Sequence, residues 1–307
     1  MQWSQIKTLF ILTFFILNIF LFIQFYEKKQ QSNLSMLERE ESTIEQILED
    51  ENITLENLPT EELDKEPFVS VRQKSFTEDD ERELAGLGKQ RPSLVTNTFL
   101  VSFMDDKIKI PEDASTSEIE EVLADKLLYA EEYRFWDWNE ELNILMFFQQ
   151  INERTIFYNQ SGMILLFLND KNEVEFLTQT MLGEAEYRQD KNPLIEPLKA
   201  IEELYNANEL TSGDEITQVE IGLHSRVPLS DGVQVFVPAW KVSVNDDKSF
   251  FVNAIEGHIF PSNELEFLEQ VITQDADRVR STMSESKLKE EILAMFEKKL
   301  ELLNWGE

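Results

Sequence analysis

The hydrophobic positions of the chain begin with an uncharged run over residues 8–26, TLFILTFFILNIFLFIQFY. As a helix rising 1.5 Å per residue, this run would be about 28 Å long, close to the ~30 Å hydrocarbon thickness of a bilayer. Trp3 before the run and Phe25 and Tyr26 at its end are aromatic residues of the kind favoured at membrane interfaces. The pattern predicts a transmembrane helix over residues 8–26, preceded by a short N-terminus over residues 1–7.

A cleaved signal peptide is the alternative interpretation of this run. Signal peptides have a shorter apolar region that ends in a small-residue cleavage site. Here the run continues into QFYEKKQQ, which contains no such triplet, so the pattern favours an uncleaved anchor. The positive charges near the run, Lys7 before it and Lys28 and Lys29 after it, do not decide its orientation.

Asn18 lies almost at the midpoint of the predicted span. A side-chain amide in hydrocarbon costs free energy unless it finds a hydrogen-bond partner. It can bond to its own helix, or it can contact a helix of another membrane protein, with Thr13 contributing. Both interpretations remain open, and we expect Asn18 and Thr13 to be candidate partner contacts in the membrane.

Residues 27–60 form a polar, acidic segment between the span and the rest of the chain. Six leucines and isoleucines recur at alternating spacings of three and four, but Glu41 and Glu51 interrupt this partial coiled-coil pattern. We predict one short helix near residues 36–50 and a linker that ends near Pro59.

Residues 61–185 predict a first lobe of mixed helices and strands. A strand over 68–76 and a helix that begins at the cap Thr77 precede a break at Arg91-Pro92. A strand over 94–104 and a helix over 115–129 follow. Four strand-like runs with short, turn-rich separators then predict an antiparallel meander, over residues 143–151, 154–159, 162–169 and 173–180.

Residues 186–264 repeat this order and predict a second lobe. A helix over 193–205 is followed by three strand-like runs over 215–224, 232–245 and 249–260. Residues 265–307 predict an acidic, mostly helical tail with one apolar docking face, formed by Leu288, Ile292, Met295, Phe296, Leu300 and Leu303. The expected fold class is therefore α+β, with a single N-terminal transmembrane helix and two lobes that each combine a helix with an antiparallel meander.

Composition removes several classes of function. The chain has 60 acidic and 28 basic residues and a formal charge of −32, which argues against binding nucleic acid through its phosphates. It has no cysteine, so it has no disulfide, thiolate metal site or cysteine nucleophile. The two histidines, His224 and His258, lack the spacing of a metal site, and we expect them to be surface or satisfied residues.

No catalytic motif is present in the sequence. The stretch over residues 86–90 resembles the end of a phosphate loop but lacks its earlier glycine and its Ser or Thr. The stretch over 170–172 begins like a calcium loop and then breaks its ligand pattern. The chain has sixty carboxylates, so many pairs could by chance have the spacing of a glycoside hydrolase, and a cell-wall hydrolase stays open as an alternative function. The sequence does not single out any one pair. We expect a non-enzymatic protein with no metal and no cofactor.

The densest aromatic cluster consists of Tyr133, Phe135, Trp136 and Trp138, interleaved with acidic residues. Aromatic rings beside carboxylates can bind sugars, which makes a cell-wall glycan-binding module the alternative function. The other interpretation is that these rings fill the core between a helix and the meander, since each buries a large area.

Several segments resemble the YycI (WalI) family over about residues 1–262. These segments are the opening MQWSQIKTLFILTFFILNIFLFIQF, ENIT at 51–54 with Leu58-Pro59, YRFW at 133–136, NQSGM at 159–163 with LND at 168–170, QTML at 179–182, VFVPAW at 235–240 and FVNAIEG at 251–257. The tail beyond residue 265 is longer and more charged than this resemblance leads us to expect.

The resemblance implies a single-pass protein of the cell membrane of Gram-positive bacteria, with a cytoplasmic N-terminus and an extracytoplasmic folded part. It implies that the protein acts with a YycH-like protein on the WalK (YycG) sensor histidine kinase, which controls cell-wall homeostasis. The span would contact the kinase's transmembrane helices, and the outer domains would contact the YycH-like protein. The sign of regulation stays open, since the pair supports the kinase in some relatives and restrains it in others.

Overall fold

The computed structural model describes Lys7, Phe10, residues 12–15 and 17–19, and then residues 43–59, 65–228 and 233–305, with the backbone alone at 226–228 and 304–305. Among these residues no helix has both the length and the apolar character needed to cross a bilayer. Most of the predicted span over 8–26 lies outside the described residues. The chain divides into a small unit, residues 1–54 with 211–214, and a large unit, residues 55–210 with 215–307.

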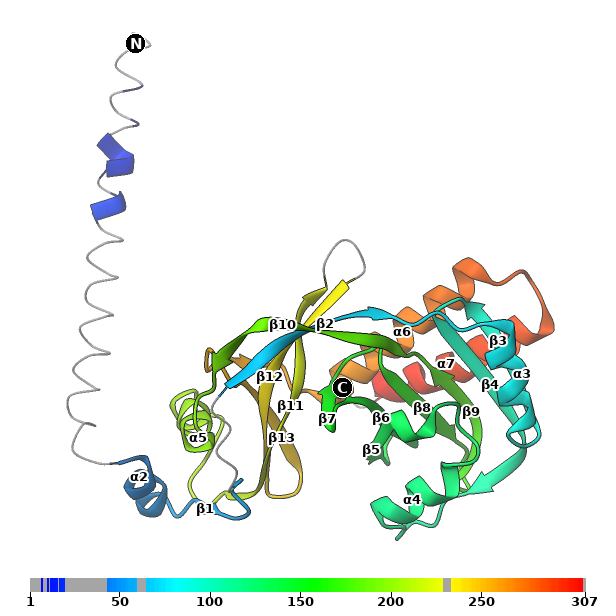
Figure 1. Ribbon diagram of the computed structural model, residues 1–307, viewed down its shortest axis with the longest axis horizontal. Helices are drawn as coiled ribbons and strands as arrows, with labels where there is room; N and C mark the ends of the chain where they lie inside the picture. The colour runs from blue at the N-terminus through cyan, green and yellow to red at the C-terminus, as the bar shows by residue number, and fades with distance from the viewer. Residues whose placement is uncertain are drawn as a thin grey trace. The chain divides into compact units, whose positions relative to one another are not determined.

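Helices and strands alternate irregularly along the chain, as in an α+β protein (Figure 1). The helices are α2 (Ile44–Asp50), α3 (Glu78–Gly86), α4 (Thr116–Leu123), the 3₁₀ turn η1 (Ala130–Glu132), α5 (Pro197–Asn206), α6 (Glu264–Thr282) and α7 (Lys287–Trp305). The strands are β1 (Thr54–Leu55), β2 (Lys65–Gln73), β3 (Gln90–Thr96), β4 (Phe99–Lys109), β5 (Tyr133–Asn139), β6 (Ile144–Ile151), β7 (Arg154–Phe157), β8 (Met163–Leu168), β9 (Glu173–Gln179), β10 (Leu182–Pro193), β11 (Glu215–Pro228), β12 (Val233–Val244), β13 (Lys248–Asn253) and β14 (Ile259–Phe260).

The described strands form one mixed sheet of 14 strands, with the main order β10-β2-β12-β11-β7-β6-β8-β9-β4-β3. The α+β class is therefore as predicted, but two separate antiparallel meanders are not. Strand β7 pairs antiparallel with β6 and parallel with β11, so it leaves the first meander and links it to the second group of strands. Strand β7 is only four residues long. Its first two residues, Arg154 and Thr155, pair with β6, and its last two, Ile156 and Phe157, pair with β11.

The pairing of β2 also crosses the expected lobe boundary. This strand lies in the range assigned to the first lobe, yet it pairs with β10 and β12. The alternation of apolar and polar residues over 68–76 predicts a strand. It does not predict which strands lie beside it, because the alternation is the same whichever strand it pairs with. The boundaries of the two lobes themselves stay a prediction.

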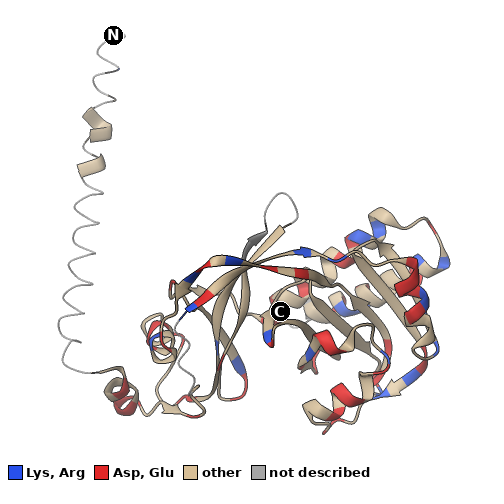
Figure 2. Ribbon diagram, viewed as in Figure 1, with Lys and Arg blue, Asp and Glu red and all other residues tan. Residues whose placement is uncertain are grey.

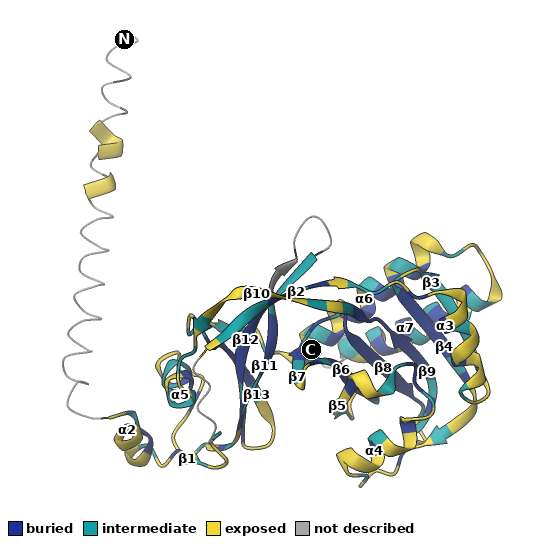
Figure 3. Cartoon of the chain, in the orientation of Figure 1, coloured by how far each residue is buried: buried dark blue, intermediate teal, exposed yellow. Residues whose placement is uncertain are grey.

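The first half of β4 and the strands β6, β8 and β9 are largely buried on both faces. In β8 the side chains of Ile164, Leu166 and Leu168 join one apolar cluster, and those of Met163, Leu165 and Phe167 join the other. Successive side chains of a strand point to opposite faces, so a continuous apolar run fills two cores. Figure 3 shows these strands as dark blue ribbons between more exposed helices.

Helices α3 and α4 begin at capping boxes on the first face of this sheet. Thr77 accepts from the backbone N–H of Asp80 in α3, and Ser115 accepts from that of Glu118 in α4. Each cap satisfies a backbone donor that the helix leaves unpaired, typically contributing about 1 kcal/mol. The cap Thr77 was predicted, and Ser115 is one of the two serines, Ser115 and Ser117, that the sequence offers as the cap of α4; this helix ends at Leu123, earlier than the expected residue 129.

Two segments differ from the sequence expectations for a clear physical reason. Pro92, which we expected to separate two elements, lies inside β3. Among the described strands β3 pairs only with β4, and such an edge strand tolerates a missing N–H. The segment over 182–193 forms strand β10, whose charged residues lack an apolar alternation because most of them are exposed.

The C-terminal helices cover the second face of the same sheet. Leu268, Ile272 and Val279 of α6 and Ile292 and Phe296 of α7 are buried in the second cluster. The predicted helical tail is confirmed, and its apolar face packs on the chain's own sheet. The remaining residues of that face, Leu288, Met295, Leu300 and Leu303, pack against the same cluster.

The small unit is held by backbone contacts around α2. Leu48 and Ile53 are buried in it. The carbonyl oxygen of Glu51 accepts from the N–H of Gly213 at 3.0 Å and from the hydroxyl of Ser212 at 2.7 Å. The short helix predicted near residues 36–50 thus appears as α2, while residues 36–42 lie outside the described part.

Candidate functional site

The large unit contains a cleft with a volume of about 1,090 Å³. Its walls are the segment 56–57, the end of β5 with the following turn (136–140), Tyr158, the start of β11, the β12–β13 hairpin and the first turn of α6 with its cap. Clefts of this size that gather a few polar groups are the usual places for ligands on protein surfaces. This cleft is therefore the candidate site.

A bulge in β5 decides which aromatic residues face the cleft. The register between β5 and β6 shifts between Phe135 and Asp137, so Trp136 is an extra residue in the strand. Regular alternation would place Trp136 and Trp138 on the same face. Instead, Tyr133, Phe135 and Trp138 join the first apolar cluster, and Trp136 joins the second. The predicted aromatic cluster is thus divided between two cores, and from it only Trp136 and Trp138 line the cleft.

Tyr133 and Phe135 lie away from the cleft. Tyr133 is buried, and its hydroxyl donates to the carbonyl oxygen of Thr180 at 2.7 Å. Burial raises the pKa of this phenol above its usual value, so it stays a neutral donor. Phe135 packs edge-on against Phe147 with 5.4 Å between ring centroids. Both side chains stabilise the core beside the meander.

Trp136 is surrounded by protein groups on several sides. Its ring contacts the rings of Phe148, Phe157, Tyr158 and Phe251 at centroid distances of 5.4 to 6.0 Å. The ammonium of Lys241 lies 4.4 Å from its centroid, in the arrangement of a cation–π contact. Lys241 also pairs with Glu220 at 3.0 Å. This lysine occupies the position over the ring that a stacked sugar would need.

Trp138 is held from the opposite side of the strand. Its indole N–H donates to Oδ1 of Asn143 at 3.0 Å, and the ring packs against the first apolar cluster. Tyr158 completes the aromatic wall, with its ring stacked on Phe267 at 4.8 Å. Its backbone φ is 45°, in the left-handed region that bulky residues rarely adopt and that typically costs about 1–3 kcal/mol.

The charge of the cleft is strongly negative. Its lining contains seven carboxylates and two ammonium groups, those of Glu56, Asp137, Glu140, Glu215, Asp246, Asp247 and Glu264 against Lys241 and Lys248. Within the part of the chain that the structure describes, no ion pair joins any of these seven carboxylates to a basic residue. The sequence shows the excess of acidic residues, but it does not show where in the fold they lack basic partners.

Two of these carboxylates have raised pKa values. Desolvation within the cleft raises the pKa of Asp137, and the backbone N–H of Trp138 and the charge of Lys241 lower it only partly. Desolvation likewise raises the pKa of Glu264, and the negative charge of Asp137 adds to this effect. Asn139 Nδ2 donates to Glu264 at 3.0 Å and fixes its orientation. Carboxylates raised in this way are typical of functional sites.

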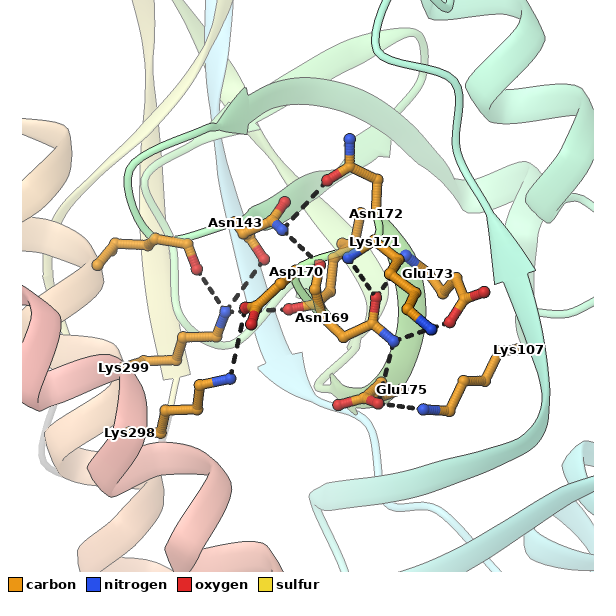
Figure 4. Close-up of polar contacts among 12 residues, drawn as sticks. Lys107, Asn143, Asn169, Asp170, Lys171, Asn172, Glu173, Glu175, Lys298 and Lys299 are labelled. Carbon is orange, nitrogen blue, oxygen red and sulfur yellow. Dashed lines mark hydrogen bonds and ion pairs between the residues drawn. The ribbon is translucent and has the colours of Figure 1, made fainter.

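A second polar cluster, around Lys299, has a structural role (Figure 4). Lys299 is buried, and its ammonium donates to the carbonyl oxygens of Leu142 and, at 3.1 Å, Leu168. Burial lowers its pKa to about 8. The nearby carboxylate of Asp170 lies 3.7 Å from the ammonium of Lys298. The turn that begins like a calcium loop in the sequence thus lies beside lysines.

The two histidines occupy different environments. His224 is buried and stacks on Phe260 with 4.0 Å between ring centroids. Burial lowers its pKa to about 4, so it is neutral at physiological pH. His258 is exposed. Among the described residues no group of three or more histidines, aspartates or glutamates is placed to hold a metal ion.

The candidate membrane contacts bond to their own helix. Asn18 Nδ2 donates to the carbonyl oxygen of Phe14 at 2.9 Å, and Thr13 Oγ1 donates to that of Phe10 at 2.9 Å. Both side chains are exposed. The bond of Asn18 uses one of its two amide N–H groups, and an amide side chain can also accept through its carbonyl oxygen. Their contact with a partner stays a prediction.

Comparison with known proteins gives one family. The family model described as YycI protein matches residues 31–255. No curated protein matches the chain. A solved structure, an uncharacterized protein from Eubacterium rectale ATCC 33656, aligns with a TM-score of 0.38 and 9% identity over 69% of this chain and 89% of that one. At this level of likeness the structure carries no argument about function.

Proposed function

The chain belongs to the YycI family, and from this premise we propose that it regulates a WalK-type sensor kinase through contacts of its transmembrane helix and of its extracytoplasmic domain. Membership implies a WalK-associated regulatory protein in a non-enzymatic family whose members are membrane-anchored. The single observation that carries the proposal is the match over residues 31–255, most of the chain outside the predicted span.

In this proposal residues 8–26 anchor the protein, with the N-terminus in the cytoplasm and residues 27–307 outside. The uncharged run of bilayer length supports the anchor. The outer part holds a YycH-like protein, and the span lies against the kinase's transmembrane helices. A bound helix can change kinase activity only by binding one conformation of the kinase better than the other. A preference of about 2–3 kcal/mol corresponds to a change of roughly tens-fold in the equilibrium.

Asn18 is the residue we propose for this preference, with Thr13 beside it. An interhelical hydrogen bond in a membrane contributes about 0.6–2 kcal/mol, or roughly three- to thirtyfold in association. The amide carbonyl of Asn18 is the group to accept such a bond, since its Nδ2 donates to Phe14.

Cross-linking in intact membranes tests this function. The chain has no cysteine, so single cysteines placed in turn at positions 13 to 20 report only on their own positions. We expect disulfide or bifunctional cross-links to the kinase at positions that recur with helical spacing. Absence of a cross-link at every position, in membranes that contain both proteins, would overturn the proposal.

The contribution of Asn18 has its own readout in the same membranes. Asn18→Leu should lower the cross-linking yield about three- to thirtyfold at a neighbouring reporter position, and Ile16→Leu should not. An unchanged yield in the Asn18→Leu variant dismisses the role of this residue while leaving the regulatory function in place.

A further inference from the structure

Two strands present consecutive residues to the cleft. Residues 136–140, from β5 onward, and residues 246–250, into β13, line it without a gap. Alternate residues of a strand point to opposite faces, so a consecutive run in one wall indicates that the edge of the strand faces the cleft. Among the described strands β5 pairs only with β6, and β14 pairs with β13 only at Phe251 and Val252. The cleft is therefore bordered by two strand edges.

The edge of β5 is already covered by side chains. The backbone N–H of Phe135 donates to Glu120 at 2.9 Å, and that of Trp138 donates to Asp137 at 2.8 Å. Carboxylates that accept from an edge strand block its pairing with another chain. A partner strand would therefore not pair with β5.

The edge of β13 is open at its first half. The N–H of Asn253 donates to the carbonyl oxygen of His258, on the side of β14. Because the backbone direction alternates with a period of two, the N–H and C=O of Ser249 point to this same side. The pairing of β14 with β13 ends at Phe260, and Pro261, which follows β14, has no N–H to offer. An extended chain can add to β13 at Ser249.

The charges of the cleft select the chemistry of such a chain. Its seven carboxylates have no ion-pair partner in the described part of the protein, and the negative charge of Asp137 raises the pKa of Glu264. A lysine or arginine between them would relieve this repulsion. The protein already places one ammonium, that of Lys241, against the aromatic wall.

We propose that the cleft binds an extended basic segment of a partner protein, which pairs with β13 at Ser249 and places lysine or arginine side chains among the carboxylates. Strand addition gives affinity through the main chain, and the side-chain surroundings give specificity. The inference deepens the proposed function by naming a binding mode for the outer part. It does not involve the kinase helices.

The cleft also adjoins the segment that follows the predicted anchor in the sequence. Glu56 and Asn57 line it. The N–H of Glu56 donates to the carbonyl oxygen of Ile216 at 2.7 Å, and Asn57 Nδ2 donates to that of Thr217 at 3.1 Å. A segment bound here would contact Glu56 and Asn57, near the beginning of the large unit.

Binding of labelled peptides to the full chain in nanodiscs tests this inference. The probe is the alternating peptide Lys-Val-Lys-Val-Lys-Val, compared with Glu-Val-Glu-Val-Glu-Val and with the basic peptide N-methylated at alternate residues. We expect saturable binding of the basic probe, no binding of the acidic one, and at least tenfold weaker binding of the N-methylated one. Equal binding of the N-methylated peptide would overturn the strand pairing.

Matched variants place the peptide in the cleft. Asp137→Asn with Glu264→Gln should weaken binding at least tenfold, and Asp113→Asn with Glu121→Gln, two exposed acids outside the cleft, should leave it within twofold. Equal losses in both pairs would show non-specific attraction and overturn the proposal. If none of the peptides binds and peptidoglycan glycan strands do, the proposal is overturned in favour of the glycan-binding alternative.

These outcomes are separate from the test of the regulatory function. Cross-links from the span to the kinase with no peptide binding would leave the function and remove the cleft as its outer binding site. Peptide binding without such cross-links would keep the cleft as a binding site and remove the proposed contact of the span with the kinase. Circular dichroism of each variant, compared with the parent, shows that a loss of binding is not a loss of fold.

Discussion

The two faces of the sheet around β8 are covered in different ways. The first face is covered by α3 and α4, which lie in the chain directly before β3 and between β4 and β5. The second is covered by α6 and α7, and α6 begins 85 residues after β9, the last strand of the meander that these helices cover, has ended. Local connections thus build one core, and a late segment of the chain completes the other.

Buried charges on both faces combine local and long-range bonds. On the first face, Asp80 is buried within the cap of its own helix, where it accepts from the N–H of Thr77, and it also accepts from the hydroxyl of Tyr129. On the second, Asp275 is buried in α6 beside Arg278, and Lys299 of α7 bonds to a carbonyl group 157 residues earlier in the chain. The bonds of Lys299 connect α7 to the turns beside β6 and β8, which are distant from it in the sequence (Figure 2 shows the acidic and basic residues along α6 and α7).

The largest expected effect comes from opening the second core. Phe296 of α7 is fully buried and contacts Phe167 and Phe176 at 5.7 and 5.6 Å. Phe296→Ala should destabilise the protein by about 3–5 kcal/mol, and protease cleavage should start in α6 and α7. Leu123→Ala, the matched change in α4, should cost about 2–5 kcal/mol but leave these two helices resistant. Urea unfolding and limited proteolysis measure both. Identical cleavage patterns would contradict the difference between the faces.

The next effect concerns Asp275, whose burial raises its pKa to about 7. The folded state then holds this proton more tightly than the unfolded state, so stability falls as the pH rises from about 4 to 7. Asp275→Asn should remove this slope and stabilise the protein by about 2–4 kcal/mol at pH 8. The exposed neighbour Asp277→Asn is the control and should retain the slope. Urea unfolding at pH 5 and pH 8 distinguishes them; a slope that persists in Asp275→Asn would refute the assignment.

The smallest of the three effects comes from the Lys299 contact. Lys299→Met keeps the apolar stem and leaves the carbonyl groups of Leu142 and Leu168 without this donor, at a cost of about 1–3 kcal/mol. Lys298→Met, at an exposed position, should change the stability by less than about 1 kcal/mol. Urea midpoints at pH 7 compare the two. A gain of stability in Lys299→Met would mean that desolvation of the ammonium outweighs its hydrogen bonds.

Much of this arrangement could be predicted from local pattern. The caps at Thr77 and Ser115, the strands β6 to β9 and the apolar face of the C-terminal tail all follow from spacing within a short window. The continuous apolar runs of β6 and β8 also indicate burial on two faces. The identity of the second cover could not be predicted, since its residues are distant in sequence.

The candidate site was less accessible to sequence reasoning. The bulge at Trp136 changes which residues of β5 face each side of the sheet, and no residue type in the sequence indicates it. Asp137 and Trp138 stood out as part of an aromatic and acidic stretch, but their cleft partners in β11, β12 and α6 lie far along the chain. The edge strand β10 was missed because its exposed residues lack the alternation that identifies a half-buried strand.

The short strand β7 has a mechanical consequence. It is the sole member of the described sheet that hydrogen-bonds to both β6 and β11, with two paired positions on each side. The chain also joins the two groups of strands directly, since β10 begins at Leu182, three residues after β9 ends at Gln179. A load on one group of strands therefore reaches the other through β7, through this covalent link and through side chains such as Gln149, which bonds to Leu182, so the two groups respond to force as one connected sheet.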